Sequence, residues 1–243
     1  MKFKDYYTGE CARLIAAKLC AVDSSSNADA FVSDVERELT SDPSFSARQD
    51  IFAAALEDLL PQDYRRALQL LEQILGPPLE QAEGMFTHGW WLWPVGRYVE
   101  RNALRDADAS LLFIRELTRR FTGEFAVRPL LAERPRETLS RMRDWAADPD
   151  VHVRRLASEG LRISLPWARK LTVAIEYFEE YREILTQLKS APEKFVQKSV
   201  GNNLNDLMKA NPEKAWLIIH TWEQDSPSPA TRWIIKHGTR SLR

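Results

Sequence analysis

The sequence has few glycines and cysteines and contains no long apolar segment. Nine glycines and a scarcity of alternating polar and apolar residues argue against a β-sheet protein. The two cysteines, Cys11 and Cys20, match no metal-binding or redox spacing, and on a helix they would point in different directions, so we expect no disulfide. No apolar run approaches the roughly 18 residues that cross a bilayer. The first ten residues also lack the apolar stretch of a signal peptide, so we expect a cytoplasmic protein without a membrane span.

Signatures of metal-dependent and cofactor-dependent enzymes are also missing. The four histidines, His88, His152, His220 and His237, are scattered, and none belongs to a ligand spacing such as HExxH. No glycine pattern of a phosphate-binding or dinucleotide-binding loop occurs, and Gly-x-Ser-x-Gly is absent. We therefore expect no metal and no cofactor, and an enzymatic activity would depend on carboxylate and aromatic side chains.

The charge of the chain is unevenly distributed, although the net charge is only −1. Residues 21–110 carry 16 acidic and 7 basic side chains, a net charge of −9. Residues 111–243 carry 23 basic and 17 acidic side chains, a net charge of +6. This asymmetry favours a protein that offers its C-terminal half to a polyanion, and chance variation of surface charge is the alternative.

Helical periodicity recurs along the whole chain. Two clear apolar stripes at helical spacing are Phe31, Val32, Val35 and Leu39, and Ala67, Leu68, Leu71, Ile74 and Leu75. Asp-Pro, Ala-Pro, Asn-Pro and Ser-Pro dipeptides separate helices of ten to twenty residues, which is typical of antiparallel helix pairs. The pattern predicts an all-α fold, a HEAT-like helical-repeat solenoid that forms a single domain over residues 1–243. Its N-terminal helices would occupy residues 1–85, and residues 86–243 would form the functional repeats.

An internal repeat supports this architecture. Three segments can be superposed, each after a proline-containing turn: Val153–Glu159, Val196–Asn202 and Ile234–Arg240. Their offsets are 43 and 38 residues, near the period of about 40–47 residues of HEAT and armadillo units. The third position is always basic, and the seventh position is always polar; these residues are Arg155, Lys198 and Lys236, and Glu159, Asn202 and Arg240. Stacking of equivalent helices would align these side chains along one face. A solvated face of a scaffold is the alternative.

Several segments contain residues suited to chemistry, and each has a structural alternative. Glu124 lies just ahead of an apolar helical run, where the helix dipole alone would favour it. Arg155 and Glu159 are four residues apart and could form a surface salt bridge. Trp167 follows Leu-Pro and either presents its indole to a ligand or belongs to the core.

Polar and aromatic clusters occur elsewhere in the chain. Asn202, Asn203 and Asn205 are poor helix formers. They would bind phosphates or sugars, or cap one another at an interface. Three tryptophans lie between residues 90 and 93, where they form a core cluster or an aromatic wall beside a nucleobase.

At these segments the sequence resembles the AlkC branch of the AlkC/AlkD-type DNA glycosylases. The resemblance extends from the Trp90 region to the C-terminus. It rests on four strings in order along the chain: Gly-Glu124-Phe-Ala-Val-Arg-Pro-Leu, Val-Arg-Arg155-Leu-Ala-Ser-Glu-Gly with Leu-Pro-Trp167, Asn202-Asn-Leu-Asn-Asp206, and Thr-Arg-Trp233-Ile.

Two motifs depart from the family pattern. The family's Arg-Pro-Arg before Leu-Pro-Trp is Arg162-Ile163-Ser164 here, and its Asn-His-Leu-Asn-Asp has Asn203 in place of histidine. One basic contact and one imidazole are therefore absent. Some relatives carry a further C-terminal immunoglobulin-like domain, and because the sequence ends at Arg243 we expect none here.

The resemblance implies a HEAT-repeat DNA glycosylase of base excision repair. Such an enzyme hydrolyses the N-glycosidic bond of cationic alkylated bases, with N3-methyladenine as a substrate and N3-methylcytosine as a further candidate. It acts without a cofactor on double-stranded DNA that contains alkylated bases. The resemblance also implies a monomer without membrane contact in the bacterial cytoplasm, associated with the nucleoid.

The resemblance assigns roles to individual residues. Glu124 and Glu159 would be catalytic, because carboxylates near the anomeric carbon stabilise an oxocarbenium-like sugar and place a water. Trp167 would contact the lesion or the deoxyribose. The expected DNA contacts are Arg154, Arg155, Lys198, Asn202, Asn205, Lys236 and Arg240. The expected aromatic wall consists of Trp90, Trp91 and Trp93.

The competing hypothesis is a non-catalytic helical-repeat module that binds damaged or branched DNA, or a protein scaffold. The two glutamates discriminate between these hypotheses. A pure DNA binder has no use for carboxylates that face a polyanion, because each one is repelled by the phosphates. An exposed apolar groove in place of the basic row would favour the scaffold.

Overall fold

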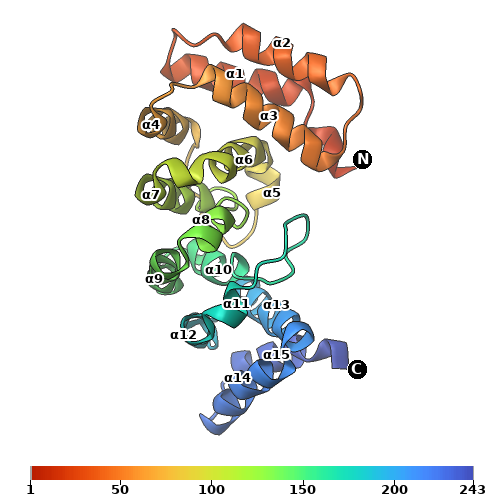
Figure 1. The fold of residues 1–243 in the computed structure, drawn as a ribbon, viewed down its shortest axis with the longest axis vertical. Helices are drawn as coiled ribbons and strands as arrows, with labels where there is room; N and C mark the ends of the chain where they lie inside the picture. The colour runs from red at the N-terminus through yellow and green to blue at the C-terminus, as the bar shows by residue number, and fades with distance from the viewer. Residues whose placement is uncertain (1, 243) are drawn as a thin grey trace. The chain divides into compact units, whose positions relative to one another are not determined.

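The computed structural model describes residues 2–242 and divides the chain into two compact units, Met1–Ala126 and Val127–Arg243. Residues 2–242 contain helices, turns and loops and no β-strand, which confirms the all-α prediction (Figure 1). The boundary between the two units follows Ala126. It therefore lies C-terminal to residue 85, at which the N-terminal helices were predicted to end. Within the described range, every helix is too short or too polar to span a bilayer.

The N-terminal unit is built from helices that pack both on their neighbours in the sequence and on helices three elements away. Its elements are η1 (Phe3–Tyr6), α1 (Gly9–Val22), α2 (Ala28–Leu39), α3 (Phe45–Leu59), α4 (Tyr64–Ile74), α5 (Met85–His88), η2 (Trp90–Leu92), α6 (Trp93–Asn102), η3 (Ala103–Arg105) and α7 (Ala107–Thr118). Helix α1 packs against α2 and α4, α3 against α2 and α6, and α7 against α4 and α6. The predicted stripes supply this core, since Phe31, Val35, Leu68 and Leu71 are buried.

Two of the three clustered tryptophans belong to this core. Trp91 and Trp93 are buried, and the ring of Trp93 lies 4.9 Å from that of Phe45. Trp90 is half-buried, and its carbonyl oxygen accepts a hydrogen bond from the Tyr7 hydroxyl at 3.0 Å. The predicted aromatic wall is therefore wrong for Trp93, whose ring packs among core side chains, whereas Trp91 also borders a cavity of this unit.

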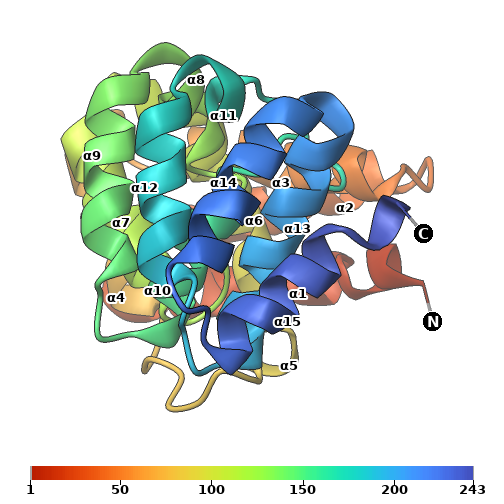
Figure 2. The same cartoon turned by 90° about the horizontal axis from the view of Figure 1, so that it is seen from below.

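The C-terminal unit consists of two layers of helices. Its elements are α8 (Arg128–Glu133), α9 (Pro135–Ala146), α10 (Val151–Glu159), α11 (Val173–Glu176), α12 (Phe178–Leu188), α13 (Lys194–Ala210), α14 (Pro212–Gln224), α15 (Pro229–Gly238) and η4 (Arg240–Leu242). Helices α9, α12 and α14 contact one another in order and form one layer, while α10, α13 and α15 form the other. Helices α9 and α12 run side by side in both views (Figure 1, Figure 2).

The proline-containing turns set the beginnings of the helices in the α10, α13 and α15 layer. Asp150 caps α10, since its carboxylate accepts hydrogen bonds from the backbone N–H groups of His152 and Val153. Ser228 caps α15 in the same way through the backbone N–H of Thr231. Side-chain oxygens at this position satisfy N–H groups that have no partner within the helix.

The internal repeat is confirmed by equivalent contacts at the two interfaces of this layer. The first positions of the three segments, Val153, Val196 and Ile234, are all completely buried. The sixth position of one helix meets the fourth position of the next at both interfaces. Ser158 Oγ lies 2.7 Å from Ser199 Oγ, and Gly201 lies against the His237 ring.

Small residues allow α13 and α15 to approach closely. A Cβ atom added to Gly238 would lie 2.6 Å from the Leu204 Cβ and 3.4 Å from the Gly201 carbonyl oxygen. The first distance is shorter than any ordinary contact between such atoms, so the two backbones would have to move apart.

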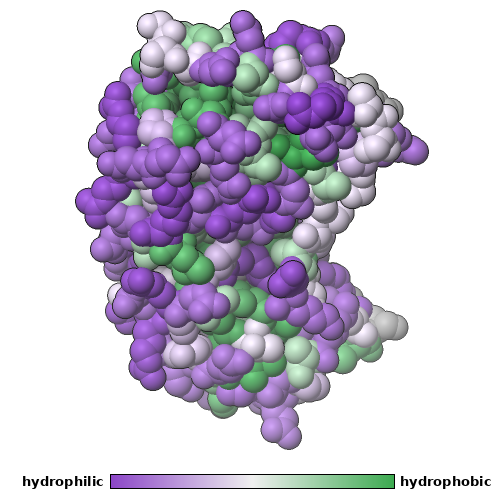
Figure 3. Space-filling view, turned by 45° about the horizontal axis from the view of Figure 1, so that its top comes forward, coloured by the Kyte–Doolittle hydropathy of each residue, from purple (hydrophilic) through white to green (hydrophobic). Residues whose placement is uncertain are grey.

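Figure 3 shows one face of the surface, on which hydrophilic residues predominate and hydrophobic residues form separate groups.

We expect Gly238→Ala to destabilise the C-terminal unit by about 1–3 kcal/mol, as overpacking of an interface does. Gly96→Ala is the matched control, because Gly96 lies within α6 and its added Cβ would make only an ordinary 3.5 Å contact with Leu117. Alanine is the better helix former by about 0.5–1 kcal/mol, so the control should gain stability. Urea denaturation followed by circular dichroism measures both effects, and equal shifts in the two variants would contradict the prediction.

Candidate active site in the C-terminal unit

Glu159 is a buried carboxylate at the C-terminal end of α10. Its residue is only 5 % exposed. An Arg162 guanidinium nitrogen donates to its Oε1 at 3.0 Å, and an Arg155 guanidinium nitrogen lies 3.5 Å from the same oxygen. The Arg155 guanidinium also lies 4.8 Å from the Phe195 ring. The pair expected from the i, i+4 spacing is present, but it is largely buried instead of being a surface salt bridge.

Arg162 connects this carboxylate to a second one on α13. Its Nε donates to Asp206 Oδ2 at 3.0 Å, and the same Asp206 oxygen accepts from the backbone N–H of Ser164 at 3.3 Å. The chain segment after α10 is therefore fastened to α13. Neither Arg162 nor Asp206 is among the predicted site residues, although Asp206 ends one of the motif strings that carry the resemblance and Arg162 begins a segment that departs from the family pattern.

The environment of Glu159 favours its ionised form. Burial would raise the pKa of Glu159, but the charges of Arg155 and Arg162, together with hydrogen bonds from Ser199 and Arg162, lower this pKa below its ordinary value. The carboxylate is therefore ionised at neutral pH. Because the pKa is depressed in the folded state, the stabilisation is present above the pKa of an unfolded glutamate, about 4.3. It is lost as the pH falls through the folded-state pKa.

Trp167 lies on an irregular segment after α10 and is 66 % exposed. Its φ of +62° lies in the left-handed region, which is strained for a bulky side chain. Arg128 at the start of α8 holds this segment. Its guanidinium donates to the carbonyl oxygens of Gly160 at 3.1 Å, Arg162 at 2.9 Å and Arg169 at 2.6 Å. The carbonyl groups that Arg128 binds lie on both sides of Trp167 in the sequence. Arg128 therefore fixes the backbone that carries the indole.

The third and seventh repeat positions on α13 and α15 carry a polar row. Lys198 and Lys236 are exposed, and Asn202 is half-buried. An Arg240 guanidinium nitrogen donates to Asn202 Oδ1 at 3.0 Å, so the seventh positions of neighbouring repeats are in contact. In the described range, no carboxylate oxygen lies within 4.0 Å of a nitrogen of Lys198, Lys236 or Arg240.

Two of the predicted DNA contacts are used for packing. The Arg154 guanidinium lies 2.5 Å from a Glu193 carboxylate oxygen and donates to the carbonyl oxygens of Asp148 and Pro149. Asn205 is 2 % exposed, and its amide donates to the Gly238 carbonyl oxygen at 3.0 Å. Asn205 cannot reach a ligand, because it lies between α13 and α15, so its prediction as a DNA contact is wrong.

Asn203 stands where the family pattern has a histidine, and its side chain forms hydrogen bonds within the structure. Its residue is buried, and its amide nitrogen donates to the carbonyl oxygens of Ser158 at 2.8 Å and Ser199 at 3.1 Å. The side chain therefore joins α10 to α13 behind the polar row. The asparagines of this segment divide into two functions, with Asn202 in the exposed row and Asn203 and Asn205 in the packing.

Glu124 belongs to the N-terminal unit and lies in the turn that precedes α8. It is buried, and the neighbouring Gly123 packs against Thr118 and Ile114. Glu124 lies just ahead of a helix, as predicted, because the turn over residues 124–127 leads directly into α8 at Arg128.

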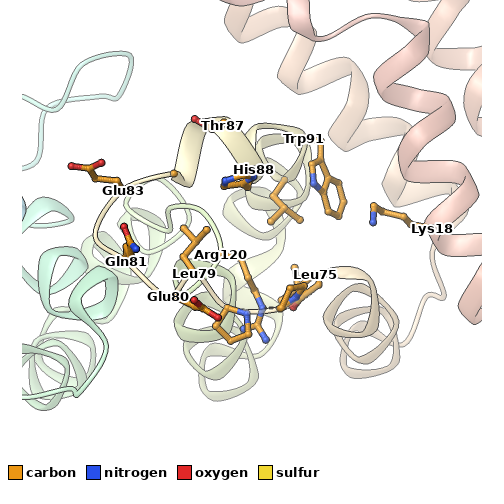
Figure 4. Close-up of a pocket in the computed structure, with 16 residues that line it drawn as sticks. Lys18, Leu75, Leu79, Glu80, Gln81, Glu83, Thr87, His88, Trp91 and Arg120 are labelled. Atoms are coloured by element: carbon orange, nitrogen blue, oxygen red, sulfur yellow. Dashed lines mark hydrogen bonds between the residues drawn. The ribbon is translucent and has the colours of Figure 1, made fainter.

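A separate cavity of about 760 Å³ lies in the N-terminal unit (Figure 4). The segment from Gly76 to Gly84 borders it, and Lys18 and Trp91 face each other across one end, with the Lys18 nitrogen 4.7 Å from the indole centroid. Apart from Trp91, none of the predicted site residues lines it. Within residues 2–242, no group of three or more His, Cys, Asp or Glu side chains is arranged to hold a metal ion.

The C-terminal half of the chain matches a known protein family. Residues 123–242 match the family model described as DNA alkylation repair enzyme. The chain is 34 % identical over 188 residues to the uncharacterized protein YhaZ of Bacillus subtilis (strain 168), covering 77 % of this chain and 50 % of that protein. The chain thus spans half the length of this curated relative.

A solved structure is similar over the whole chain. It is that of the Pseudomonas fluorescens alkylpurine DNA glycosylase AlkC bound to DNA containing an abasic site analog. The TM-score is 0.86 at 30 % sequence identity, and the match covers 100 % of this chain and 65 % of that chain. The helical-repeat class predicted from the sequence is therefore confirmed.

We expect Arg162→Gln to raise the pKa of Glu159, because it removes one of the two cations that keep this buried carboxylate ionised. Carbon-13 NMR of the glutamate carboxyl groups measures the pKa directly. The variant should lose about 3 kcal/mol of stability at pH 7, as removal of one partner from a buried ion pair does. This loss should shrink as the pH falls through the folded-state pKa of wild-type Glu159.

Arg182→Gln is the control for this experiment, because Arg182 pairs with Glu179 at 2.7 Å on the exposed surface of α12. Breaking an exposed pair costs at most about 1 kcal/mol. An unchanged pKa of Glu159 in the Arg162 variant, or equal stability losses in both variants, would contradict the prediction.

Proposed function

We propose that this chain, which belongs to the family of DNA alkylation repair enzymes, is a DNA glycosylase for cationic alkylated bases. It would hydrolyse the N-glycosidic bond of N3-methyladenine, and of N3-methylcytosine as a second substrate, in double-stranded DNA. The observation that carries the proposal is the ionised, buried Glu159 at one end of a row whose cations, Lys198, Lys236 and Arg240, have no carboxylate partner among residues 2–242.

The chemistry of the substrate explains why this site needs a carboxylate and no strong acid. A positively charged base is already a good leaving group, so its departure requires no proton from the enzyme. The transition state places positive charge on the deoxyribose, and a fixed anion stabilises that charge most effectively where water is excluded. Glu159 is suited to this function because Arg155 and Arg162 hold it in one orientation.

The other residues would position the DNA. Trp167, which is exposed on the segment that Arg128 holds, would contact the lesion or its deoxyribose. Lys198, Asn202, Lys236 and Arg240 would contact backbone phosphates, which positions the duplex without reading its sequence. Arg155 would orient Glu159, whose Oε1 lies 3.5 Å from an Arg155 guanidinium nitrogen. Glu124 would act as a second catalytic carboxylate, on the evidence of its place in the matched motif.

The alternative function, a module that binds DNA without catalysis, gives no reason for the carboxylate. An ionised glutamate near a phosphate row weakens DNA binding. Two arginines and Asp206 maintain its position, as a catalytic carboxylate would require.

We expect Glu159→Gln to reduce the release of N3-methyladenine by about 100-fold or more, as the loss of one preorganised electrostatic group does. The variant should also be less stable, because Arg155 and Arg162 lose a charged partner, so the assay must be run where circular dichroism shows a folded protein. Glu124→Gln should act in the same direction, and the two losses need not add. Single-turnover excision from methylated duplex DNA, with released bases identified by chromatography, measures these rates.

Glu183→Gln is the matched control, because Glu183 forms a half-exposed pair with Arg143 in the α9 and α12 layer. Its rate should equal that of wild type. Equal rates in wild type and the Glu159 variant would remove the catalytic role of Glu159. The absence of excision by wild type would favour the binding module.

We expect Lys198→Ala and Lys236→Ala each to weaken duplex binding and to lower the salt slope by about one, because each removes one phosphate contact. Lys214→Ala removes the same charge from α14 in the other layer, where the Lys214 nitrogen lies 4.3 Å from the Phe178 ring. Its slope should remain that of wild type. Fluorescence anisotropy of a labelled duplex over a range of salt concentrations tests this, and equal slopes in all three variants would show that the row does not contact DNA.

A further inference from the structure

His237 on α15 lies at the centre of the polar row and has no function in the proposal above. Its ring stacks on Trp233, with centroids 4.9 Å apart and planes within 9° of each other. On its other side the His237 ring lies against the backbone of α13, since a Cβ atom on Gly201 would lie 2.8 Å from the His237 Cδ2. The imidazole is therefore held in one orientation by an indole and by a glycine.

Hydrogen bonds determine which nitrogen carries the proton. Asn202 Oδ1 lies 3.0 Å from His237 Nε2 and also accepts from an Arg240 nitrogen at 3.0 Å. An arginine can only donate, so the Asn202 atom between them is the carbonyl oxygen, which can only accept. His237 must therefore carry a proton on Nε2, and the neutral ring has its unprotonated nitrogen at Nδ1.

The surroundings of His237 are positively charged. Burial and the charges of Arg240 and Lys198 lower the pKa of His237 below its ordinary value. Lys194 on α13 adds a third cation, with its nitrogen 4.2 Å from the centroid of the Trp233 ring. The acidic group whose field reaches Arg240 is Asp206, and this carboxylate is already bonded to Arg162 and to the Ser164 backbone.

We propose that His237, Lys198 and Arg240 form a subsite for one phosphate of the DNA backbone, with Asn202 orienting the imidazole and the guanidinium. The inference rests on the proposed DNA binding and adds a residue and a protonation step to it. Lys198 and Arg240, which form no ion pair within residues 2–242, repel one another and a protonated imidazole, and a phosphate would reduce this repulsion. His237 then takes up a proton at Nδ1 as the phosphate enters, so binding strengthens as the pH falls through the pKa of His237 in the complex.

A second tryptophan–histidine pair in the chain provides an internal control. Trp216 and His220 have the same i, i+4 spacing on α14 and stack with centroids 5.5 Å apart. His220 is exposed, and within residues 2–242 it makes no hydrogen bond to a side chain and no ion pair. The two pairs differ in the cations and the asparagine that surround them, so a variant of each separates a phosphate site from stacking alone.

The test compares binding of wild type, His237→Gln and His220→Gln to an undamaged fluorescein-labelled duplex at pH 8 and pH 6 and constant ionic strength. We expect wild-type affinity to rise by up to about tenfold more than that of the His237 variant, which corresponds to a shift of about one pKa unit. The wild-type salt slope should also steepen by about one at pH 6. The His220 variant should behave like wild type. A His237 variant with the pH dependence of wild type would overturn the proposal.

NMR of the histidine Cε1–H groups provides a second measurement that does not depend on affinity. The His237 signal, assigned by its loss in His237→Gln, should report a pKa below 6.5 in the free protein and a higher value with duplex. Inorganic phosphate at the same phosphate concentration should cause a much smaller shift. An equal shift would assign the subsite to free phosphate and overturn the DNA contact.

The outcomes for the two proposals are distinguishable. If wild type does not bind duplex at any pH, the proposed function and this inference both fail. If it binds duplex and the His237 signal does not move, only the inference fails.

Discussion

The close packing of α10, α13 and α15 is the constraint on which the rest of the C-terminal unit depends. Small side chains at the sixth repeat position, Ser158 and Gly201, allow each helix to meet the fourth position of the next. The first position is also buried in every repeat. The third and seventh positions therefore carry the polar row. The order of charges along the row is then set by the sequence alone, since every helix repeats the same geometry.

The order of charges along the row keeps two requirements apart that would conflict if they were met at the same place. A carboxylate is needed where positive charge develops on a sugar, but a carboxylate weakens the binding of a phosphate backbone. At the seventh position the charge is negative in Glu159, neutral in Asn202 and positive in Arg240. The negative end is compensated by Arg155 and Arg162. At the other end, Arg240 forms no ion pair within residues 2–242, so this part of the row is the one suited to an external anion.

The fold was predictable from the sequence because its determinants are local. Helix caps, proline turns and the first buried position of each repeat recur within short segments, and periodicity detects them. The link from Arg162 to Asp206 was not predictable, because it joins residues that are 44 positions apart and depends on the stacking of α10 on α13. Burial was misjudged for the same reason at Asn205 and at Trp93. A polar or aromatic side chain in a helix has the same local pattern whether it faces solvent or the next helix.

The departures from the family pattern have different consequences in physical terms. Asn203 stands where the family has an imidazole, yet it is buried and hydrogen-bonded to two backbone carbonyl groups. The row nevertheless contains an imidazole, that of His237 on the neighbouring helix, bonded to Asn202. At the other departure, Arg162 retains the guanidinium that binds Glu159, while Ile163 is buried and Ser164 contributes a backbone N–H to Asp206. The contacts that hold the Glu159 carboxylate are therefore present without the second arginine, and its absence would reduce affinity for phosphate and leave the ionisation of Glu159 unchanged.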